Sequence, residues 1–585
     1  MTIPLLTLAA SVAGTLAPTA LRCECLTDPL AIDRTEPELS WKVREARAGL
    51  KNLRQTAYRV LVASAPEILE KDRGDLWDSG KVQSAETYGI VYAGLPLKSR
   101  QRCWWKVKVW DQDGDESSWS EPAKFRMGLL SPSDWTAKWI GIDAPDRLSP
   151  EGERFSGANW IWSKTDQQGK VPKVTRTFIR TFAADPEALE SAVLNITVDD
   201  QFVLFLNGTE VARSDGQPEA WRRAHRLDLL PLLKKGENEL RVDATNDGET
   251  ASGVLAKLVL DRKQGSSQII VTDESWQEPN GPGVTVIAPF TGGPWGNFGA
   301  ITLRGATYYR REFRTKAKVT RATAYVTALG LVDLHVNGKR VNEALFTPGW
   351  TDYDKRVYYR SFDISAVVQE GQNCVGVVLG DGWYSGYVGF GAKRAHYGER
   401  PRVLAQIELE LEDGSREIIG TDESWLASTG PTLEQDFLMG ETYDARLAKP
   451  WCEASFKAEG WIRSDTHEAP KAVLQAFPAE PVLPYKELQP ISIKKLPSGA
   501  YLLDFGQNLA GFLKLKLKGR RGQEITLRHG EWLNPDGTLY TTNLRAARAT
   551  DLYICGGEEE EWSPRFTFHG FQYAEISGLD QEPKA

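Results

Sequence analysis

The stretch TDESW at residues 272–276 decides the architecture of this chain, because it recurs without change at residues 421–425. Two further matches keep the same order along the chain: Leu206-Asn207-Gly208 with Val336-Asn337-Gly338, and Gly236-Glu237-Asn238 with Gly371-Gln372-Asn373. The number of residues between matching positions varies along the chain, and differences in loop length account for this variation. Such self-similarity predicts two copies of one domain, which we place at residues 131–300 and 301–470.

The repeated domain is predicted to be a β-sandwich. Segments such as 58–63 (YRVLVA), 105–110 (WKVKVW) and 512–517 (FLKLKL) alternate apolar and polar residues, as half-buried strands do. Asp-Gly and Asn-Gly turns separate the strands, and helical patterns are short. The chain is therefore predicted to be all-β, with tandem β-sandwich domains. Residues 21–130 resemble a fibronectin type III domain whose tryptophans pack its core, and residues 471–585 form a further β-sandwich domain.

Charge, cysteine and histidine content exclude several classes of protein. The chain has 71 Lys and Arg against 79 Asp and Glu, a net charge of −8, whereas nucleic-acid binders usually present a basic face. No apolar run reaches the ~18 residues of a membrane span. Six Cys are too few for a disulfide-built scaffold, and the six His include no pair at zinc-ligand spacing. We expect no nucleic-acid partner, no membrane partner and no zinc chemistry.

Residues 1–20 leave two interpretations open. The segment 4–13 (PLLTLAASVA) has the length and apolarity of a signal-peptide core, and Ser11-Val12-Ala13 fits a small-x-small cleavage site. No Lys or Arg precedes Arg22, however, so the positively charged start of a signal peptide is missing. A cleaved leader of a secreted or periplasmic protein and an ordinary first strand of a cytoplasmic one both remain open.

The two copies differ where one of them carries adjacent acids. Asp199-Asp200 of the first copy falls on Leu329-Gly330 of the second, so the shared fold does not require acids there. Asn246 in turn falls on Asp381. Asp199, Asp200 and Asn246 offer the hard oxygen donors that Ca²⁺ takes, with carbonyls and waters completing the shell. The alternative is a solvated turn with a capping asparagine.

The second copy has a Gly-rich aromatic segment at residues 380–391 (GDGWYSGYVGFG). It lacks the sequence of a phosphate-binding loop and no βα unit surrounds it. Glycines let a backbone approach another surface closely, and Trp383, Tyr384, Tyr387 and Phe390 offer flat apolar faces. Either a sugar or a neighbouring domain suits such faces, and we favour the domain contact.

Four stretches carry a resemblance to a known family: 380–386 (GDGWYSG), 439–446 (MGETYDAR), 504–508 (DFGQN) and 564–571 (PRFTFHGF). They resemble the N-terminal β-domain region of bacterial α-L-rhamnosidases, glycoside hydrolase family 78. Residues 21–24 (LRCE) with 37–41 (PELSW) look like the first, fibronectin-like domain of that family. The resemblance covers the chain from about residue 18 to residue 580.

The resemblance implies a carbohydrate-binding role for the first copy. It is similar to the rhamnose-binding module of the family, a jelly roll in which calcium helps to hold the sugar. Asp199 and Asp200 match the acidic calcium position of that module, and Asn246 matches its asparagine. The family often has Asp-Asn where this chain has Asp-Asp, a change that keeps an oxygen ligand and adds charge. Trp221 is our candidate for stacking on the sugar.

The family resemblance also predicts what this chain lacks. Family enzymes carry their two catalytic carboxylates on an (α/α)6 barrel, which we do not find here, so no residue inherits a catalytic role. Glu441 and Asp444 are interpreted as structural or barrel-facing. We predict a carbohydrate-binding, scaffolding chain that is non-catalytic alone and acts on L-rhamnose-containing glycans. Two alternatives stay open: part of an active α-L-rhamnosidase whose barrel is on a separate or truncated polypeptide, and an adhesion protein that uses its aromatic surfaces.

Overall fold

The computed structural model describes residues 14–142, 155, 157–214, 221, 224–290, 293–295, 303–389 and 393–584. In these ranges the chain is nearly all β, and its two α-helices, α1 (Pro66–Leu69) and α2 (Gly382–Ser385), have four residues each. None of the helices in the described ranges has the length and apolarity to cross a bilayer. Short 3₁₀ turns occur at Pro132–Asp134, Pro186–Ala188, Leu230–Leu232, Gly293–Trp295, Ala445–Leu447 and Thr542–Leu544. The all-β prediction is confirmed.

The first domain is a two-sheet sandwich. One sheet has the order β1 (Leu16–Cys23), β2 (Glu38–Glu45), β6 (Ile90–Val91). The other has the order β4 (Trp77–Asp78), β3 (Ala57–Ala63), β7 (Arg102–Trp110), β8 (Ala123–Arg126), with β5 (Val82–Gln83) paired to β3. Trp41 and Trp105 are buried between the sheets. The alternation of β7 therefore sends its apolar residues into this core.

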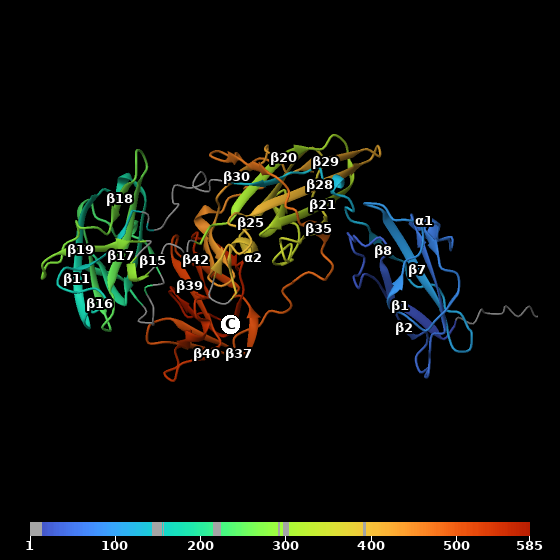
Figure 1. The fold of residues 1–585 in the computed structure, drawn as a ribbon, viewed down its shortest axis with the longest axis horizontal. Coiled ribbons are helices and arrows are strands. Elements are labelled where there is room, and N and C mark those ends of the chain that lie inside the picture. The colour runs from blue at the N-terminus through green and yellow to red at the C-terminus, as the bar shows by residue number, and fades with distance from the viewer. Residues whose placement is uncertain are drawn as a thin grey trace, which may run out of the picture. The chain divides into compact units, whose positions relative to one another are not determined.

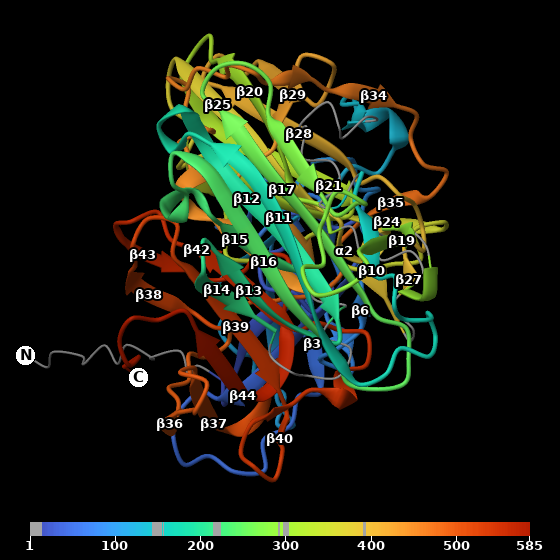
Figure 2. The same ribbon diagram turned by 90° about the vertical axis from the view of Figure 1, so that its left-hand side faces the viewer.

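The chain divides into two compact units, residues 144–303 and the remainder, and each is described by itself. The described strands between residues 144 and 303 form a jelly roll of two sheets (Figures 1 and 2). The first sheet has the order β15 (His225–Asp228), β12 (Leu189–Asp199), β17 (Gly253–Arg262), β10 (Asn159–Ser163), β19 (Val284–Pro289), with β18 (Gln268–Val271) on β17. The second has the order β11 (Val174–Ala184), β16 (Gly236–Asn246), β13 (Gln201–Leu206), β14 (Thr209–Arg213).

The second jelly roll repeats this topology. One sheet has the order β34 (Asp465–His467), β9 (Trp139–Gly141), β28 (Arg402–Leu411), β21 (Val319–Leu329), β24 (Arg356–Asp363), β35 (Val473–Ala476), with β29 (Arg416–Gly420) on β28. The other has the order β23 (Lys339–Arg340), β22 (Leu331–Val336), β25 (Gln372–Gly380), β20 (Thr307–Arg314), β30 (Leu426–Ser428), β33 (Ile462–Arg463). A hairpin of β26 (Tyr387–Val388) and β27 (Lys393–Arg394) stands beside them.

The duplication extends to individual hydrogen bonds. The indole N–H of Trp276 donates to the carbonyl of Val271 at 2.9 Å, and that of Trp425 donates to Gly420 at 2.9 Å. The turn asparagines behave alike: Asn207 donates to Asn238 at 2.9 Å, and Asn337 donates to Asn373 at 2.8 Å. The repeated residues therefore make the same structural hydrogen bonds in both copies, and this shared role accounts for their identity.

Two predicted boundaries differ from the structure. Strand β9 pairs with β28 and β34, so residues 131–142 belong to the second jelly roll, and residues 144–303 are inserted between its first strand and β20. Strands β31 (Thr432–Asp436) and β32 (Gly440–Asp444) join the C-terminal sheet rather than the second copy. Both differences arise because strand partners distant in sequence decide which domain a short strand joins.

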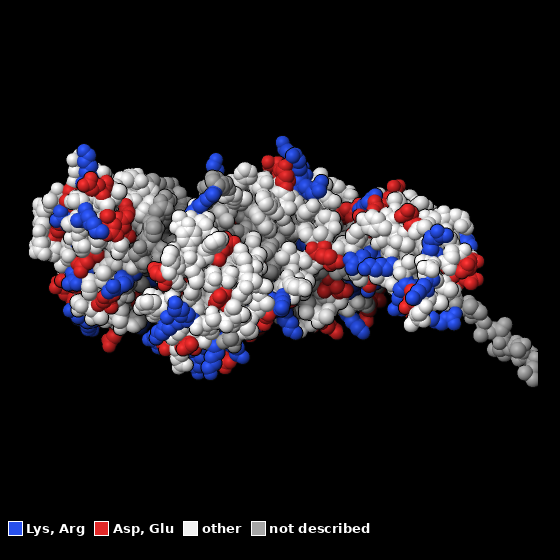
Figure 3. Space-filling model, turned by 90° about the horizontal axis from the view of Figure 1, so that it is seen from below, with Lys and Arg blue, Asp and Glu red and all other residues white. Residues whose placement is uncertain are grey.

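The C-terminal β-sandwich is built on a seven-stranded sheet. Its order is β31, β32, β42 (Thr550–Ile554), β39 (Glu524–Gly530), β44 (His569–Ser577), β37 (Tyr501–Gly511), β36 (Ser492–Lys495). A two-stranded sheet of β38 (Leu515–Lys518) with β43 (Glu559–Trp562) and a hairpin of β40 (Trp532–Leu533) with β41 (Leu539–Tyr540) complete it. On the face shown in Figure 3, Lys and Arg are interspersed with Asp and Glu.

Candidate functional site

The predicted calcium ligands lie together at one end of the 144–303 jelly roll. Asp199 ends β12, Asp200 precedes β13, and Asn246 ends β16. The backbone N–H of Asp200 donates to the carbonyl of Thr245 at 3.1 Å, and the N–H of Asp247 donates to a carboxylate oxygen of Asp200 at 2.8 Å. The structure therefore brings the three residues to one place, although they come from two different sheets.

Asp199 is held by an indole. Its side chain is buried, and Trp295 donates its Nε1–H to Oδ2 of Asp199 at 2.7 Å. Trp295 in turn stacks on Trp160, with ring centroids 4.2 Å apart and planes inclined by 19°. Gly253 makes room for this stack, because a Cβ there would lie 2.7 Å from Trp295 and 2.9 Å from Trp160. One carboxylate oxygen is thus fixed in position by a buried aromatic pair.

Asn246 is fully buried and ties a loop to the end of β16. Its amide nitrogen donates to the carbonyls of Val171 at 2.7 Å and Pro172 at 3.1 Å, and to that of Gly248. Its Oδ1 accepts from the hydroxyl of Thr250 at 3.3 Å. The amide nitrogen is committed to the backbone, as the capping alternative expects, and Oδ1 is the atom that offers a lone pair to a cation.

Trp221 lies at the same end of the sandwich. The hydroxyl of Thr197, two residues before Asp199, donates to the carbonyl of Trp221 at 2.5 Å. The half-buried indole packs against a cluster that contains Trp160, Leu255 and Trp295. Trp160 and Trp295 were not predicted as part of this site, because neither has a local sequence pattern that links it to Asp199. The pairing of β10, β17 and β12 brings Trp160 close to Asp199, and Trp295 reaches them from the 3₁₀ turn that follows β19.

The residue types at this end are ones that can bind calcium. Two carboxylates and one amide oxygen are hard donors of the kind that Ca²⁺ binds through six to eight oxygens. Adjacent carboxylates repel each other in a partly buried setting, and a divalent cation relieves that repulsion. The residues that would hold the ion are Asp199, Asp200 and Asn246, and it would supply free coordination positions for sugar hydroxyls.

A second cluster of metal-type side chains lies inside the C-terminal sandwich. Within the described ranges, His529, Asp551 and His569 form the one group of three or more His, Cys, Asp or Glu whose ligand atoms converge. His569 Nε2 lies 3.1 Å from both carboxylate oxygens of Asp551. The two imidazoles stack with ring centroids 4.2 Å apart and ring planes inclined by 25°, so the ring nitrogens lie in two nearly parallel planes. We interpret the cluster as a buried hydrogen-bond network, in which burial lowers the pKa of His529 to about 3.

The aromatic segment after β25 packs within the protein. Trp383 stacks on Trp350, with ring centroids 5.8 Å apart. Its ring centroid lies 4.4 Å from that of Phe437. Phe437 in turn contacts Phe568, so this aromatic cluster reaches the C-terminal sandwich. Tyr387 is buried and its backbone N–H donates to Asp436. The predicted Phe390 lies outside the described residues.

The carboxylates of the 439–446 motif are internal. Glu441 is buried and accepts the backbone N–H groups of Arg565 and Phe566, each at 3.0 Å. Burial raises the pKa of Glu441 to about 7. Asp444 is also buried and receives the guanidinium of Arg446 at 2.8 Å. Both side chains are bound within the protein, Glu441 by backbone N–H groups and Asp444 by Arg446.

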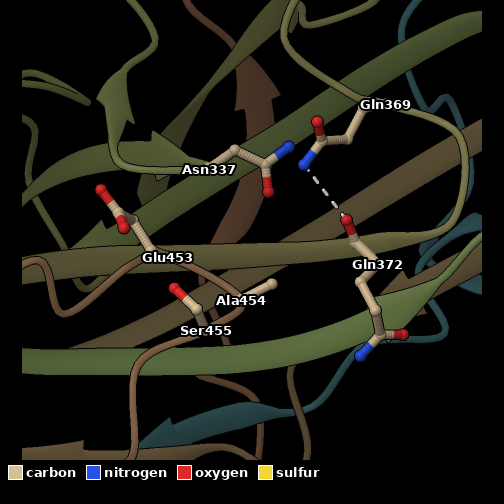
Figure 4. A pocket seen from close by; sticks show the side chains of 6 residues that line it. All are labelled: Asn337, Gln369, Gln372, Glu453, Ala454 and Ser455. Carbon is tan, nitrogen blue, oxygen red and sulfur yellow. Dashed lines mark hydrogen bonds between the residues drawn. The ribbon is translucent and has the colours of Figure 1, made fainter.

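A cavity of about 490 Å³ lies at the turns of the second jelly roll (Figure 4). Its lining is formed by Asn337, Gln369, Gln372, Glu453, Ala454 and Ser455. Asn337 donates both to Asn373 and to the carbonyl of Val367, so it serves the duplicated turn. The lining offers neither an aromatic face nor a pair of carboxylates, and it matches none of the predicted sites.

Comparisons with known proteins agree with this architecture. Three family models match: "Rha78A-like, N-terminal immunoglobulin domain" at residues 18–131, "Alpha-L-rhamnosidase N-terminal domain" at 317–485, and "Bacterial alpha-L-rhamnosidase concanavalin-like domain" at 494–585. An α-L-rhamnosidase of Streptomyces avermitilis is 40% identical over 96% of this chain and 55% of its own length. One of Formosa agariphila is 28% identical over 95% of this chain and 44% of its own length.

Solved structures give the same result. The S. avermitilis α-L-rhamnosidase complexed with L-rhamnose has a TM-score of 0.79 at 39% identity, over 97% of this chain and 56% of that one. The Dictyoglumus thermophilum α-L-rhamnosidase has a TM-score of 0.65 at 29% identity, over 97% of this chain and 48% of that one. The chain thus spans about half the length of these relatives. With its duplicated jelly rolls and its matches to three domain models of these enzymes, the chain belongs to the bacterial α-L-rhamnosidase family, glycoside hydrolase family 78.

Proposed function

We propose that this chain acts on L-rhamnose-containing glycans and that the 144–303 jelly roll binds a rhamnose unit through calcium. The observation that supports the proposal is that Asp199, Asp200 and Asn246 all lie at one end of that jelly roll, where Trp295 holds the Asp199 carboxylate and stacks on Trp160. The relative solved with L-rhamnose supports the choice of sugar, since it is similar over nearly the whole of this chain.

In the proposed complex, the ion is held by the carboxylates of Asp199 and Asp200 and by Oδ1 of Asn246. Vicinal hydroxyls of the sugar complete its coordination shell, as oxygen ligands do for Ca²⁺. The aromatic side of the site, with Trp221 as our stacking candidate, receives the apolar face of the ring. Affinity then depends on the ion, because a neutral sugar brings no charge of its own.

We further propose that the described β domains bind and orient the glycan and do not hydrolyse it by themselves. Inverting hydrolysis needs two carboxyl groups on opposite sides of the bond, about 6.5–9.5 Å apart. The motif carboxylates Glu441 and Asp444 are buried and bound to backbone or arginine donors, which leaves neither available to a substrate. Hydrolysis by the family reaction would then need a catalytic barrel that works together with these domains.

Calorimetry with L-rhamnose tests the binding proposal. Titration of the purified chain in the presence of Ca²⁺ should show binding that disappears with a chelator. The Asp199→Ala variant should lose tenfold or more in affinity, a change of about 1.4 kcal/mol. Glu190→Ala, an exposed acid on β12 of the same jelly roll, serves as the matched control and should bind as the wild type does. Affinity unchanged by chelator and by Asp199→Ala would refute the calcium site.

A chromogenic aryl α-L-rhamnoside tests the second part. The purified 585-residue chain should release no chromophore, and activity should appear when a family barrel is added in trans. Steady turnover by the chain alone, at a rate that follows its concentration, would contradict the non-catalytic assignment.

A further inference from the structure

The two jelly rolls can be matched position by position at the end that carries the proposed calcium site. In the first, Asp199 of β12 lies opposite Gly253 of β17. In the second, Leu329 of β21 lies opposite Arg402 of β28. The neighbouring strands pair in the same register, Ile161 with Val254 and Ile140 with Val403. Leu329, Arg402 and Trp139 therefore occupy the places of Asp199, Gly253 and Trp160.

The exchange changes what fills this end of the sandwich. In the first jelly roll, Gly253 lets Trp295 stack on Trp160. In the second jelly roll, Arg402 occupies the position of Gly253. A cavity of about 430 Å³ lies beside it. Its lining includes Trp139, Leu329, Tyr384, Arg400, Arg402 and His467. That volume lies within the range of roughly 300–1,000 Å³ found for small-molecule sites.

The second jelly roll does not reproduce the calcium ligands. Leu329 replaces Asp199, and Gly330 replaces Asp200 at a place where a Cβ would lie 2.4 Å from the carbonyl oxygen of Gly380. Asp381, which replaces Asn246, is buried and forms an ion pair with Arg394. Any ligand of this cavity is therefore held without a calcium ion of the kind proposed for the first copy.

The lining suits a sugar with free hydroxyls. Its floor is apolar, because Trp139 and Leu329 are buried in a core cluster. Its sides offer the N–H donors of Arg400 and Arg402, the carboxylate acceptors of Glu399 and Glu468, and the hydroxyl of Tyr384. A neutral pyranose both donates and accepts hydrogen bonds around one apolar face. The opposite charges of the arginines and glutamates give no net preference for an anion or a cation.

Two side chains of the cavity are held in place by close packing. The guanidinium of Arg402 lies over Gly141, where a Cβ would be 2.4 Å from Nη1, and it donates to the carbonyl of Pro401 at 3.3 Å. The hydroxyl of Tyr384 lies over Gly398 in the same manner, 2.3 Å from the place of a Cβ. Pre-positioned polar groups lose little conformational entropy on binding.

We propose that the second jelly roll carries a calcium-independent binding site for a neutral sugar unit, formed around Arg402, Tyr384 and Trp139. The choice of a sugar rests on the proposed saccharide function of the first jelly roll, whereas the cavity and its lining do not. The duplicated fold would then present two sugar sites of different chemistry, one dependent on calcium and one dependent on direct hydrogen bonds.

Ligand-observed NMR on the full chain tests this proposal. Saturation transfer to methyl α-L-rhamnopyranoside and to a neutral rhamnose-containing disaccharide is measured in chelator and in an Asp199→Ala background, which silence the first site. We expect the transfer to persist there and to fall fivefold or more in Arg402→Ala. Arg416→Ala, on the neighbouring strand β29, is the matched control and should leave the transfer unchanged.

The outcomes separate the two sites. Transfer that vanishes with chelator, or that survives Arg402→Ala in full, would overturn the second site. Strong, salt-sensitive transfer to a uronic acid in place of neutral sugars would overturn its assigned class. Calcium-dependent binding that is intact in Arg402→Ala shows that this variant is folded. If the wild-type chain shows saturation transfer that resists chelator but no binding that depends on calcium, the first site alone would be refuted.

Discussion

Glu441→Gln should remove a pH dependence from the stability of the C-terminal sandwich. Glu441 is 1% exposed, and burial raises its pKa from 4.5 to about 7. A carboxyl whose pKa is raised on folding stabilises the native state fully below pH 4.5 and loses that contribution as the pH rises through 7. A shift of this size corresponds to about 3 kcal/mol. Glutamine has the shape and hydrogen-bonding pattern of the protonated acid and does not ionise.

Hydrogen exchange of peptides that cover residues 439–444 and 564–568 measures this effect locally, which matters because a multidomain chain does not unfold in one step. Comparing variant and wild type at the same pH cancels the intrinsic pH dependence of exchange. At pH 5 the two should be protected nearly equally. At pH 8 the variant should be more protected, by up to about 100-fold for a difference of 3 kcal/mol.

The matched control is Glu559→Gln, since this glutamate lies on the surface of the same sandwich with its side chain 71% exposed. Its variant should follow the wild type at every pH. A Glu441→Gln/wild-type protection ratio that stays constant from pH 5 to pH 8 would refute the reasoning. It would mean that the backbone N–H groups of Arg565 and Phe566 keep the carboxyl ionised despite its burial.

Two further predictions concern contacts of the jelly rolls. Asn373→Ala removes a buried amide that bonds Asn337 and the turn backbone, and should lower the stability of the second jelly roll by about 2–3 kcal/mol. Hydrogen exchange of peptides from β22 and β25 measures this loss. Gln372→Ala, at an exposed position, is the control and should leave the stability unchanged. Gly253→Ala should displace Trp295 and cost about 1–3 kcal/mol, seen as a changed near-ultraviolet circular dichroism and weaker rhamnose binding. Gly248→Ala, where a Cβ has ordinary 3.7 Å contacts, is the control, and equal behaviour of the two variants would contradict the role of the indole stack.

Much of the fold was predictable because its signals are local. Alternation along β7 and Asn-Gly turns such as Asn337–Gly338 depend on neighbouring residues alone, so they are visible in any sequence. The duplication was visible for a related reason: the residues that repeat are those whose side chains close turns and strand ends in both copies. The assignment of β9 was not predictable, because its partner β28 lies some 260 residues away.

The candidate site shows the same division. Asp199, Asp200 and Asn246 stood out from the sequence because the second copy has different residues at those positions. The support of Asp199 by Trp295, and of Trp295 by Trp160, had no such signal. Trp160 reaches this end through the register of β10, and Trp295 reaches it from the 3₁₀ turn after β19, so both contacts join segments that are distant in the sequence.

By itself, the amino-acid sequence determined that this chain is a series of β-sandwiches, that two of them are copies, and that one copy carries an acidic pair. These properties follow from periodicity and composition, which act over a few residues at a time. The tertiary structure alone decided which strands share a sheet, that residues 144–303 interrupt the sequence of the second jelly roll between β9 and β20, and that Arg402 takes the strand position that Gly253 has in the first jelly roll. Contacts between distant segments form only when the complete sheets bury their apolar faces together, so no shorter stretch contains them.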